Sequence, residues 1–461
     1  MEKDIFKTCF TPYDIRGKFP EQISEDVAYK IGVAYANEFN TGGPVKRIAV
    51  GRDVRFSSPA ISKALIKGLN DGGVDTLDIG LCGTEVVYFT STLPDIDGGI
   101  MVTASHNPKE YNGMKIVLKD AVPVVSDTGL KNIEERLISG NLKYSVKKGQ
   151  TMKFDPTELY LKKLFQFLEE SSIKKFKIVA NPGNGCAGII LKYLKKQLPV
   201  QITSIQEEPN GNFPDGVPNP LLMENRKTTS EEIIKKGADF GVAWDGDNDR
   251  CFFFDENGNF IEGYYIVGLI AERFLRKNPG GKIIYDPRLI WNTIDIVKKM
   301  GGIPLQNKTG HAFFKQRMRK EDAVYGGEMS AHHYFRDFKF CDSGMIPLLV
   351  MLDILSLKKC SLAEAILERQ HMFPCSGEIN KKVENPDKIM DNVYNHFKNI
   401  ASDVDFTDGL SMEFLKDKKT GWRFNLRKSN TEPLIRLNVE AKREKELVEE
   451  KTKEILNLIG E

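Results

Sequence analysis

The sequence has almost no net charge, no long apolar run and no closely paired cysteines. Of its 461 residues, 66 are Lys or Arg and 64 are Asp or Glu, which gives a formal net charge of +2. So balanced a chain offers no bulk electrostatic attraction for nucleic acid or for an anionic membrane, and we expect neither as a partner. Any positive charge that matters for function must therefore be local.

The missing apolar and cysteine patterns exclude further classes of protein. The most apolar stretch, residues 345–357, contains Pro347 and Asp353 and is too short to cross a bilayer, so it predicts a buried helix. The first residues, Met-Glu-Lys-Asp, carry acids and open no apolar segment, so we expect no signal peptide. The seven cysteines are an odd number without a C-x-x-C pair. They favour reduced thiols in a cytoplasmic protein over disulfides or a zinc site.

The rest of the chain alternates helical patterns with short apolar strands. A helix is expected over residues 24–39, with Ser24 as its N-cap, followed by a strand at 47–50. Ser57 or Ser58 is then expected to cap the next helix. Such alternation is typical of α/β domains with largely parallel sheets.

From about residue 373 the pattern changes. Strands at 422–426 and 434–439 precede a highly charged final helix at 442–458, which predicts a small α+β domain. A chain of this length suggests roughly three or four domains. We place the domains at residues 1–150, 151–253, 254–370 and 371–461.

One loop places a serine at the end of a buried strand. Residues 103–108, Thr-Ala-Ser-His-Asn-Pro, follow the apolar run 99–102. In open α/β sheets, reactive groups gather in loops at the carboxyl ends of strands. Ser105, beside His106, could be a nucleophile or a phosphate carrier. The alternative is a simple Asn-Pro turn in which both side chains cap the backbone.

A second loop, residues 245–250, carries three carboxylates at alternate positions. Asp245, Asp247 and Asp249 would repel one another in a tight loop unless a hard cation held them. Mg²⁺ would need further oxygen ligands, and a phosphate is the natural source. Arg250 would neutralise or orient the remaining charge.

Two familiar types of acidic loop fit these residues less well. An EF-hand is disfavoured because residues 251–254 form an apolar strand before Glu256, which would be the twelfth residue of such a loop. A haloacid-dehalogenase site expects Thr or Val where Asp249 stands. A solvated acidic turn remains the alternative.

Two later loops offer groups that suit a sugar phosphate. Residues 327–333 place Glu328, Ser330 and His332 at alternate positions, which in an extended loop would face the same way and could bind sugar hydroxyls. Structural roles for the histidines are the alternative. Residues 427–433 gather a guanidinium, two hydroxyls and an amide, the groups that bind a phosphate dianion, without Walker-loop spacing. A charged hairpin turn is the alternative there.

Taken in order, these four loops resemble the signature loops of the α-D-phosphohexomutase superfamily, within its phosphomannomutase/phosphoglucomutase group. The similarity extends over essentially the whole chain and includes residues 13–17, 262–268 and 286–288. It implies four domains around a central cleft, three similar α/β domains with mixed sheets and a smaller C-terminal α+β domain. One departure is Ala331, where many dual-specificity relatives have Gly, and it bears on mannose-versus-glucose preference.

The resemblance also implies a role for each site residue. Phosphorylated Ser105 would be the phosphoryl donor, and Ser105, Asp245, Asp247 and Asp249 would hold Mg²⁺. The other groups expected near the phosphoserine are Arg16, His106, Lys115 and Arg250, with Lys115 or His106 as the general base. The expected substrate-binding residues are Tyr13, Arg288, His311, Glu328, Ser330, His332, Arg427, Ser429, Asn430 and Thr431.

The implied reaction interconverts mannose 1-phosphate and mannose 6-phosphate through a hexose 1,6-bisphosphate, which also serves as activator, and supplies GDP-mannose synthesis. The alternatives are a phosphoglucomutase, a dual-specificity mutase, a Mg²⁺-dependent sugar phosphatase or a non-catalytic sugar-phosphate sensor. The expected partners are small hexose phosphates, and the expected state is a cytoplasmic monomer or weak homodimer.

Overall fold

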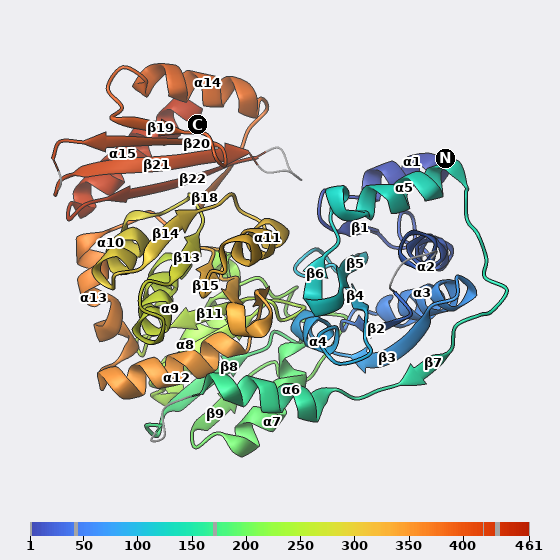
Figure 1. The fold of residues 1–461 in the computed structure, drawn as a ribbon. Helices are drawn as coiled ribbons and strands as arrows, with labels where there is room; N and C mark the ends of the chain where they lie inside the picture. The colour runs from blue at the N-terminus through green and yellow to red at the C-terminus, as the bar shows by residue number, and fades with distance from the viewer. Residues whose placement is uncertain (1, 41–44, 169–172, 418, 429–433, 461) are drawn as a thin grey trace. The chain divides into compact units, whose positions relative to one another are not determined.

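The computed structural model describes residues 2–40, 45–168, 173–417, 419–428 and 434–460. The chain divides into two compact units. Unit 1 contains residues 1–260 and 332–357, and unit 2 contains residues 261–331 and 358–461. Figure 1 labels the helices and strands of both.

The N-terminal part of unit 1 is built on one mixed sheet. Its elements are α1 (Glu2–Cys9), β1 (Ile15–Lys18), α2 (Glu25–Phe39), β2 (Arg47–Arg52), α3 (Ser58–Asp71), β3 (Asp75–Leu81), α4 (Thr84–Thr90), β4 (Gly98–Val102), β5 (Tyr111–Leu118), η1 (Lys119–Ala121), β6 (Val122–Pro123), η2 (Ser126–Thr128), α5 (Leu130–Ser139) and β7 (Thr151–Lys153). The sheet order is β1-β5-β4-β2-β3-β7. Strand β2 runs parallel to β3 and β4, whereas β5 is antiparallel to β4 and β1. Helices α2 and α3 pack side by side (Figure 1).

The first residues of α2 and α3 differ in how they are capped. Ser24 caps α2 as expected, because its Oγ accepts a hydrogen bond from Val27 N at 3.2 Å. For α3, one of the two expected residues, Ser57, does occupy the N-cap position, but its side chain makes no capping hydrogen bond to the described residues. Ser58 Oγ donates to Asp53 Oδ1 at 2.5 Å, so its hydroxyl binds the residue that follows β2 and does not cap the helix.

The rest of unit 1 carries a second mixed sheet and a buried helix. Its elements are α6 (Thr157–Leu164), η3 (Phe165–Phe167), β8 (Lys177–Asn181), α7 (Ala187–Gln197), β9 (Gln201–Ser204), η4 (Met223–Asn225), α8 (Lys227–Lys236), β10 (Phe240–Trp244), β11 (Cys251–Phe254), β12 (Phe260–Ile261), β16 (His333–Phe335), η5 (Arg336–Phe338), β17 (Cys341–Asp342) and α12 (Ile346–Lys358). Strand β8 is parallel to β9 and β10, and β11 is antiparallel to β10. Helix α12 is buried over most of its length, which confirms the helix expected at 345–357.

Unit 2 combines a parallel α/β part with the C-terminal antiparallel sheet. Its elements are α9 (Gly263–Lys277), β13 (Lys282–Tyr285), α10 (Trp291–Lys299), β14 (Ile303–Gln306), α11 (His311–Glu321), β15 (Tyr325–Gly327), α13 (Leu362–Met372), β18 (Ile379–Lys382), α14 (Pro386–Phe397), β19 (Asp403–Asp405), β20 (Leu410–Leu415), β21 (Gly421–Lys428), β22 (Leu434–Ala441) and α15 (Lys445–Ile459). Strand β13 pairs in parallel with β14 and β15. The last sheet has the order β18-β22-β21-β20-β19, with α14 and α15 packed together beside it (Figure 1).

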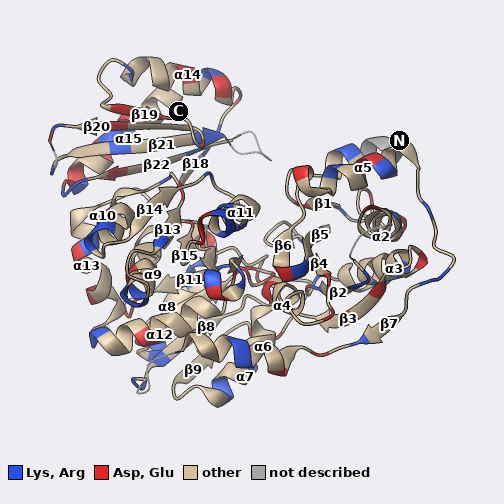
Figure 2. Ribbon diagram, viewed as in Figure 1, with Lys and Arg blue, Asp and Glu red and all other residues tan. Residues whose placement is uncertain are grey.

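These elements confirm the expected class: α/β parts with mixed sheets and a smaller C-terminal α+β part. All seven cysteines are free thiols. Lys and Arg are interspersed with Asp and Glu along the helices (Figure 2). None of the helices formed by the described residues has the length and apolarity needed to span a bilayer.

Candidate active site

The serine loop presents Ser105 in a strained backbone conformation at the end of β4. Its φ is +50°, in the left-handed region that non-glycine residues seldom adopt. The side chain is buried, with Oγ 3.0 Å from Asp245 Oδ2 and 3.1 Å from His106 Nδ1. Strain of this kind persists where the surrounding structure enforces it, and functional sites are common examples.

The acidic loop follows β10 and converges as the sequence suggested. Asp245, Asp247 and Asp249 are all buried, and one carboxylate oxygen of each lies within 4.8 Å of the others. Gly246 permits the approach of the two loops, because a Cβ there would lie 2.7 Å from Ser105 O. The left-handed residue in the acidic loop is Asn248, at φ +62°.

These three carboxylates fit a hard divalent cation. Burial, together with the charges of Asp249 and Asp247, raises the pKa of Asp245, so the cluster resists carrying its full negative charge. Among the described residues, Asp247 Oδ1 is buried without a hydrogen-bond partner. A buried, unpaired carboxylate oxygen is costly unless a cation or donor meets it, and carboxylate oxygens are the ligands that Mg²⁺ takes. The loop can therefore hold a metal ion.

Lys115 reaches the same carboxylates from β5. Its Nζ lies 2.7 Å from Asp247 Oδ2 and 2.5 Å from Asp249 Oδ2. Burial lowers the pKa of Lys115, but the charges of Asp247 and Asp249 outweigh it and raise that pKa above its ordinary value. Lys115 is therefore a cation held against the acidic loop.

Two arginines and His106 surround the serine. Arg250 Nη2 lies 2.7 Å from His106 Nδ1, and Arg250 Nε lies 3.5 Å from Asp245 Oδ2. Arg16 donates to Asn107 Oδ1 in the serine loop at 2.7 Å. Burial, followed by the charges of Arg250 and Arg16, holds the pKa of His106 well below its usual value. The imidazole is therefore neutral and sits between cations. Tyr13, also expected at the site, lies in the turn that leads into β1, where its backbone N donates to Thr11 Oγ1 at 3.3 Å.

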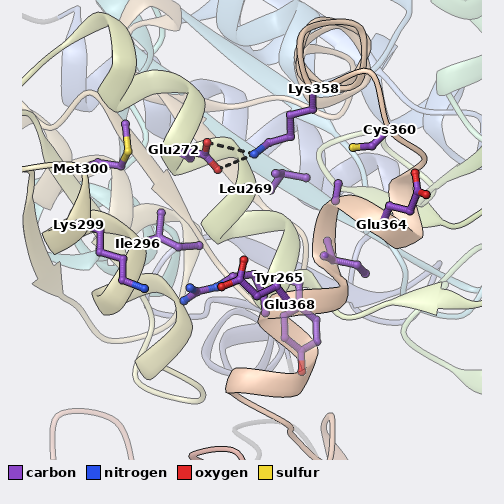
Figure 3. A pocket seen from close by; sticks show the side chains of 13 residues that line it. Tyr265, Leu269, Glu272, Ile296, Lys299, Met300, Lys358, Cys360, Glu364 and Glu368 are labelled. Carbon is purple, nitrogen blue, oxygen red and sulfur yellow. Dashed lines mark hydrogen bonds and ion pairs between the residues drawn. The ribbon is translucent and has the colours of Figure 1, made fainter. Parts of the chain in front are cut away.

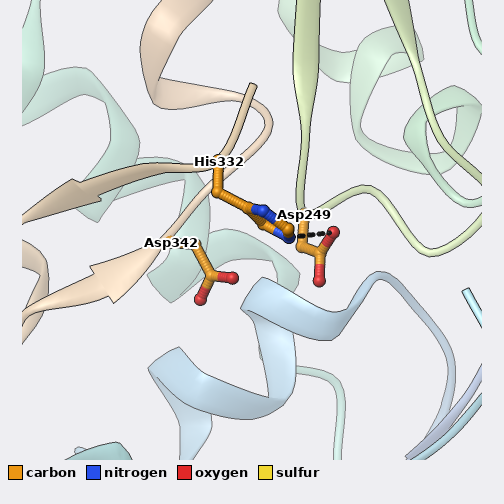
Figure 4. Close-up of side chains that lie close together, drawn as sticks. All are labelled: Asp249, His332 and Asp342. Carbon is orange, nitrogen blue, oxygen red and sulfur yellow. Dashed lines mark ion pairs between the residues drawn. The ribbon is translucent and has the colours of Figure 1, made fainter. Parts of the chain in front are cut away.

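His332 lies in unit 1 beside the acidic loop. Its Nε2 is 3.4 Å from Asp249 Oδ1, and Asp342 completes a compact trio with them (Figure 4). The expectation of an extended loop from Glu328 to His332 is wrong. Ala331 N donates to Glu328 O at 2.9 Å, and Ala331 has φ +68°, so the loop makes a tight turn. Alternate side chains in a turn do not share one direction.

In unit 2, Arg288 connects the residues expected to bind the sugar. Its Nη2 lies 2.7 Å from Asp286 Oδ2, 3.3 Å from Ser330 Oγ and 3.9 Å from Glu328 Oε2. Glu328 Oε2 also accepts from Gly310 N at 2.9 Å, next to His311 at the start of α11. Arg288, Glu328 and Ser330 therefore belong to one polar cluster, and His311 follows the glycine that donates to Glu328.

Glu378 extends that cluster to Arg427. Its Oε2 lies 3.3 Å from Arg288 Nη1 and 3.0 Å from Arg427 Nη2, and Arg427 Nη1 donates to Thr309 Oγ1 at 3.2 Å. Burial raises the pKa of Glu378, but Arg427 and Arg288 outweigh it and lower that pKa to about 2. The expected phosphate-binding residues Ser429, Asn430 and Thr431 lie outside the described residues.

Several supporting residues of the site could not be recognised in the sequence. Thr84, the first residue of α4, donates from Oγ1 to Asp247 Oδ2 at 2.6 Å, and Glu85 accepts from Asn248 Nδ2 at 2.6 Å. Arg55 donates to the carbonyl oxygen of Ser105 at 2.8 Å. The one sequence feature that could have indicated them is their place just after predicted strands. They follow β2, which is parallel to β4, and β3, which is parallel to β2. Their polar side chains therefore come after strands that end at the same edge of the sheet.

Unit 2 also contains a separate cavity of about 440 Å³, shown in Figure 3. Tyr265, Leu269 and Ile296 contribute to its wall, and Lys358 there makes two hydrogen bonds to Glu272, both 3.1 Å long. The described site residues discussed above do not line it.

Four domain models cover most of the chain. The phosphoglucomutase/phosphomannomutase α/β/α domains I, II and III match residues 7–143, 158–258 and 262–373, and the C-terminal domain of that family matches residues 378–458. The fold is that of the phosphohexomutases, and the chain belongs to the phosphoglucomutase/phosphomannomutase family.

Individual relatives agree with this assignment. The chain is 50% identical over 462 aligned residues to a phosphomannomutase of Escherichia coli (strain K12), covering 98% of this chain and 99% of that protein. It is 49% identical over 451 residues to a protein named phosphohexose mutases from Xanthomonas campestris pv. campestris (strain B100), covering 98% and 99%. A crystal structure of a phosphoglucomutase/phosphomannomutase family protein from Burkholderia thailandensis superposes with a TM-score of 0.86 at 29% identity, covering 98% of this chain and 97% of the other.

Proposed function

We propose that this chain is a phosphohexomutase that interconverts mannose 1-phosphate and mannose 6-phosphate. The observation that carries the proposal is the position of Ser105 Oγ, 3.0 Å from Asp245 in a metal-competent acidic loop. Phosphoryl transfer requires in-line positioning and charge neutralisation more than covalent chemistry from the protein, and the cations beside the two loops support the second requirement. The close, full-length relatives named phosphomannomutase support the choice of sugar.

In this proposal Ser105 carries a phosphoryl group and passes it to O6 of mannose 1-phosphate. The O6 hydroxyl loses its proton to a base, the bond from phosphorus to Ser105 Oγ breaks, and a 1,6-bisphosphate results. Ser105 Oγ takes a proton as it leaves, and the bisphosphate then turns so that its O1 phosphoryl group faces the serine. Ser105 Oγ loses its proton to the base and bonds to that phosphorus, the bond from phosphorus to O1 breaks, and O1 takes up the proton, which releases mannose 6-phosphate. Of the two expected candidates for the base, we favour His106, because its imidazole is neutral, whereas the charges of Asp247 and Asp249 keep Lys115 protonated.

The chain's own cations neutralise the transferring group. Lys115, Arg250 and Arg16 each lie against the serine loop or the acidic loop, so they bring positive charge to the transferring oxygens. Asp245, Asp247 and Asp249, with an oxygen on Ser105, would hold Mg²⁺, which supplies Lewis-acid stabilisation of the phosphoryl oxygens when bound.

The polar groups of unit 2 would bind the substrate. In the proposal, the Glu328 carboxylate accepts hydrogen bonds from sugar hydroxyls, and the Ser330 hydroxyl donates to or accepts from an adjacent one. Arg288 fixes both side chains through contacts of 3.9 and 3.3 Å. Arg427 binds the phosphate that is not being transferred, a role in which a planar guanidinium offers paired donors. We propose the same phosphate role for Ser429, Asn430 and Thr431, and substrate contacts for Tyr13, His311 and His332.

The proposal has finer features, which are supported by the family and by the relatives named phosphomannomutase. They are preference for mannose, requirement for Mg²⁺, activation by a hexose 1,6-bisphosphate, a cytoplasmic monomer or weak homodimer, and supply of GDP-mannose synthesis. We also propose the domain bounds 1–150, 151–253, 254–370 and 371–461.

A coupled assay tests the proposal. Purified protein is given mannose 1-phosphate or glucose 1-phosphate, with and without Mg²⁺ and a hexose 1,6-bisphosphate. We expect a higher kcat/KM for mannose 1-phosphate and loss of turnover without Mg²⁺. Equal kcat/KM values would replace the mannose assignment with dual specificity. Release of inorganic phosphate without isomerised sugar would contradict the mutase assignment.

A further inference from the structure

Arg55 is a fully buried arginine, and every N–H group of its guanidinium makes a hydrogen bond close to Ser105. It follows β2, and its side chain is 0% exposed. A guanidinium has five N–H donors. Here Nε donates to Asp53 Oδ2 at 3.1 Å, and the two Nη atoms donate to the carbonyl oxygens of Pro108 (2.7 Å), Tyr111 (3.0 Å), Ser105 (2.8 Å) and Asn107 (2.7 Å).

These four carbonyls define the path of the serine loop. Three of them belong to residues 105–108, and they turn inward toward one guanidinium. Carbonyl oxygens that converge in a buried site repel one another unless a donor or cation meets them. Ser105 itself has φ +50°, a left-handed conformation that is unfavourable for a non-glycine residue and needs such enforcement.

Arg55 is in turn fixed on its other sides. Asp53 accepts from Arg55, from Thr103 Oγ1 at 2.7 Å and from Ser58 Oγ at 2.5 Å, so the carboxylate is anchored at two further points. The ring of Phe213 lies 5.7 Å from the guanidinium carbon and covers it. The guanidinium therefore has a defined position from which to hold the loop.

We propose that Arg55 is a positioning residue for the reaction, which holds the serine loop so that Ser105 Oγ stands beside Asp245. This inference rests on the proposed function. Its distinctive requirement is the planar fork of donors. A lysine would keep the charge but has three donors on a single nitrogen and cannot meet four carbonyls in this arrangement.

Arg55→Lys tests the requirement, with Arg52→Lys as the matched control. Arg52 is the last residue of β2, three positions before Arg55, and pairs with Asp78 at 3.1 Å instead of binding the serine loop. We expect Arg55→Lys to lower kcat by about 100-fold, the scale on which small misplacements of a reacting group act, while KM for mannose 1-phosphate stays within about threefold. Phosphorylation of Ser105 by a hexose 1,6-bisphosphate, followed by intact-protein mass spectrometry, should slow in parallel. Arg52→Lys should keep both rates.

Chemical rescue separates geometry from charge. In Arg55→Ala, added guanidinium should restore part of kcat and added methylammonium should not, since only the former is a planar fork. Wild-type kcat in Arg55→Lys, a loss confined to KM, or equal rescue by the two ions would overturn the proposal.

Two further results keep the test decisive. Should neither Arg55 variant fold, Phe213→Leu removes the ring that covers the guanidinium. A several-fold fall in kcat at unchanged KM would then support the proposal, and an unchanged kcat would overturn it. If the wild-type protein fails to isomerise either sugar, the proposed function is what fails. Ser105 phosphorylation by the bisphosphate still compares Arg55→Lys with Arg52→Lys in that case.

Discussion

Replacing Lys115 by methionine leaves the carboxylates of Asp247 and Asp249 without the ammonium that lies 2.7 and 2.5 Å from them. All three side chains are buried. Removing one partner of a buried ion pair costs about 3–5 kcal/mol, because the remaining charge is left uncompensated. For a domain-sized unit, each kcal/mol lowers the midpoint of thermal unfolding by about 2–4 °C. We therefore expect a fall of roughly 6–20 °C in EDTA.

Mg²⁺ should raise the midpoint of thermal unfolding by different amounts in Lys115→Met and in the wild type. The ammonium of Lys115 and a bound cation compete for the same oxygens, so Lys115→Met should bind Mg²⁺ more tightly than the wild type. A ligand that binds the native state alone raises the free energy of unfolding by RT ln(1 + c/Kd), where c is the free ligand concentration, so the variant with the lower Kd gains more at the same ligand concentration. Saturating Mg²⁺ should thus raise the midpoint of the variant by more than that of the wild type.

Differential scanning calorimetry in EDTA and in a series of Mg²⁺ concentrations gives both quantities. Lys131→Met is the control, since Lys131 is exposed and lies 4.0 Å from Glu135. A surface pair of this kind contributes about 0–1 kcal/mol. Equal Mg²⁺-induced shifts in Lys115→Met and wild type, or no loss of stability in EDTA, would refute the reasoning.

Three further predictions concern Asp247 in the acidic loop, Glu85 in the helix beside that loop, and Ala331 in the loop before His332. Asp247→Asn should weaken Mg²⁺ binding and lower activity together, and an unchanged Mg²⁺ titration of activity would remove this residue from the metal site. Burial raises the pKa of Glu85 to about 8, above its value in the unfolded chain, so the folded state holds a proton that the unfolded chain releases. The wild type should therefore lose stability between about pH 5 and pH 8, by up to about 1.4 kcal/mol per pH unit. In Glu85→Gln, urea unfolding across that range should lack this slope, and identical slopes would count against it. Ala331 has φ +68°, so Ala331→Gly should be as stable as wild type or up to about 1 kcal/mol more stable, because relief of strain offsets the entropy cost of glycine. The variant should also move the ratio of kcat/KM toward glucose 1-phosphate; a clear loss of stability or a fixed ratio would contradict these expectations.

Local patterns in the sequence predicted local structure well. Ser24 precedes acids and an amphipathic run, and it caps α2 through a bond to a residue three positions away. The carboxylates of the acidic loop converge because they follow a buried strand and repeat at alternate positions. Helix α12 was evident from its apolar composition.

Contacts between residues far apart in the chain could not be predicted from such local patterns. Arg55 is defined by carbonyls about 50 residues later in the chain, and Glu85 by Asn248, 163 residues away. Gly246 is needed for the close approach to Ser105 O, far earlier in the chain, while Asn248 supplies the left-handed residue. The loop before His332 turns because of the conformation of Ala331, which no side-chain pattern reveals.

The central claim is that Ser105 carries the phosphoryl group between the two ends of a mannose phosphate. The most direct test is to treat the wild type and Ser105→Ala with a hexose 1,6-bisphosphate labelled in its phosphates, and to map the label by peptide mass spectrometry. We expect label on the peptide that contains Ser105, its discharge on addition of mannose 1-phosphate with formation of mannose 6-phosphate, and neither event in Ser105→Ala. Sustained isomerisation by Ser105→Ala, or label on a different residue, would contradict the account.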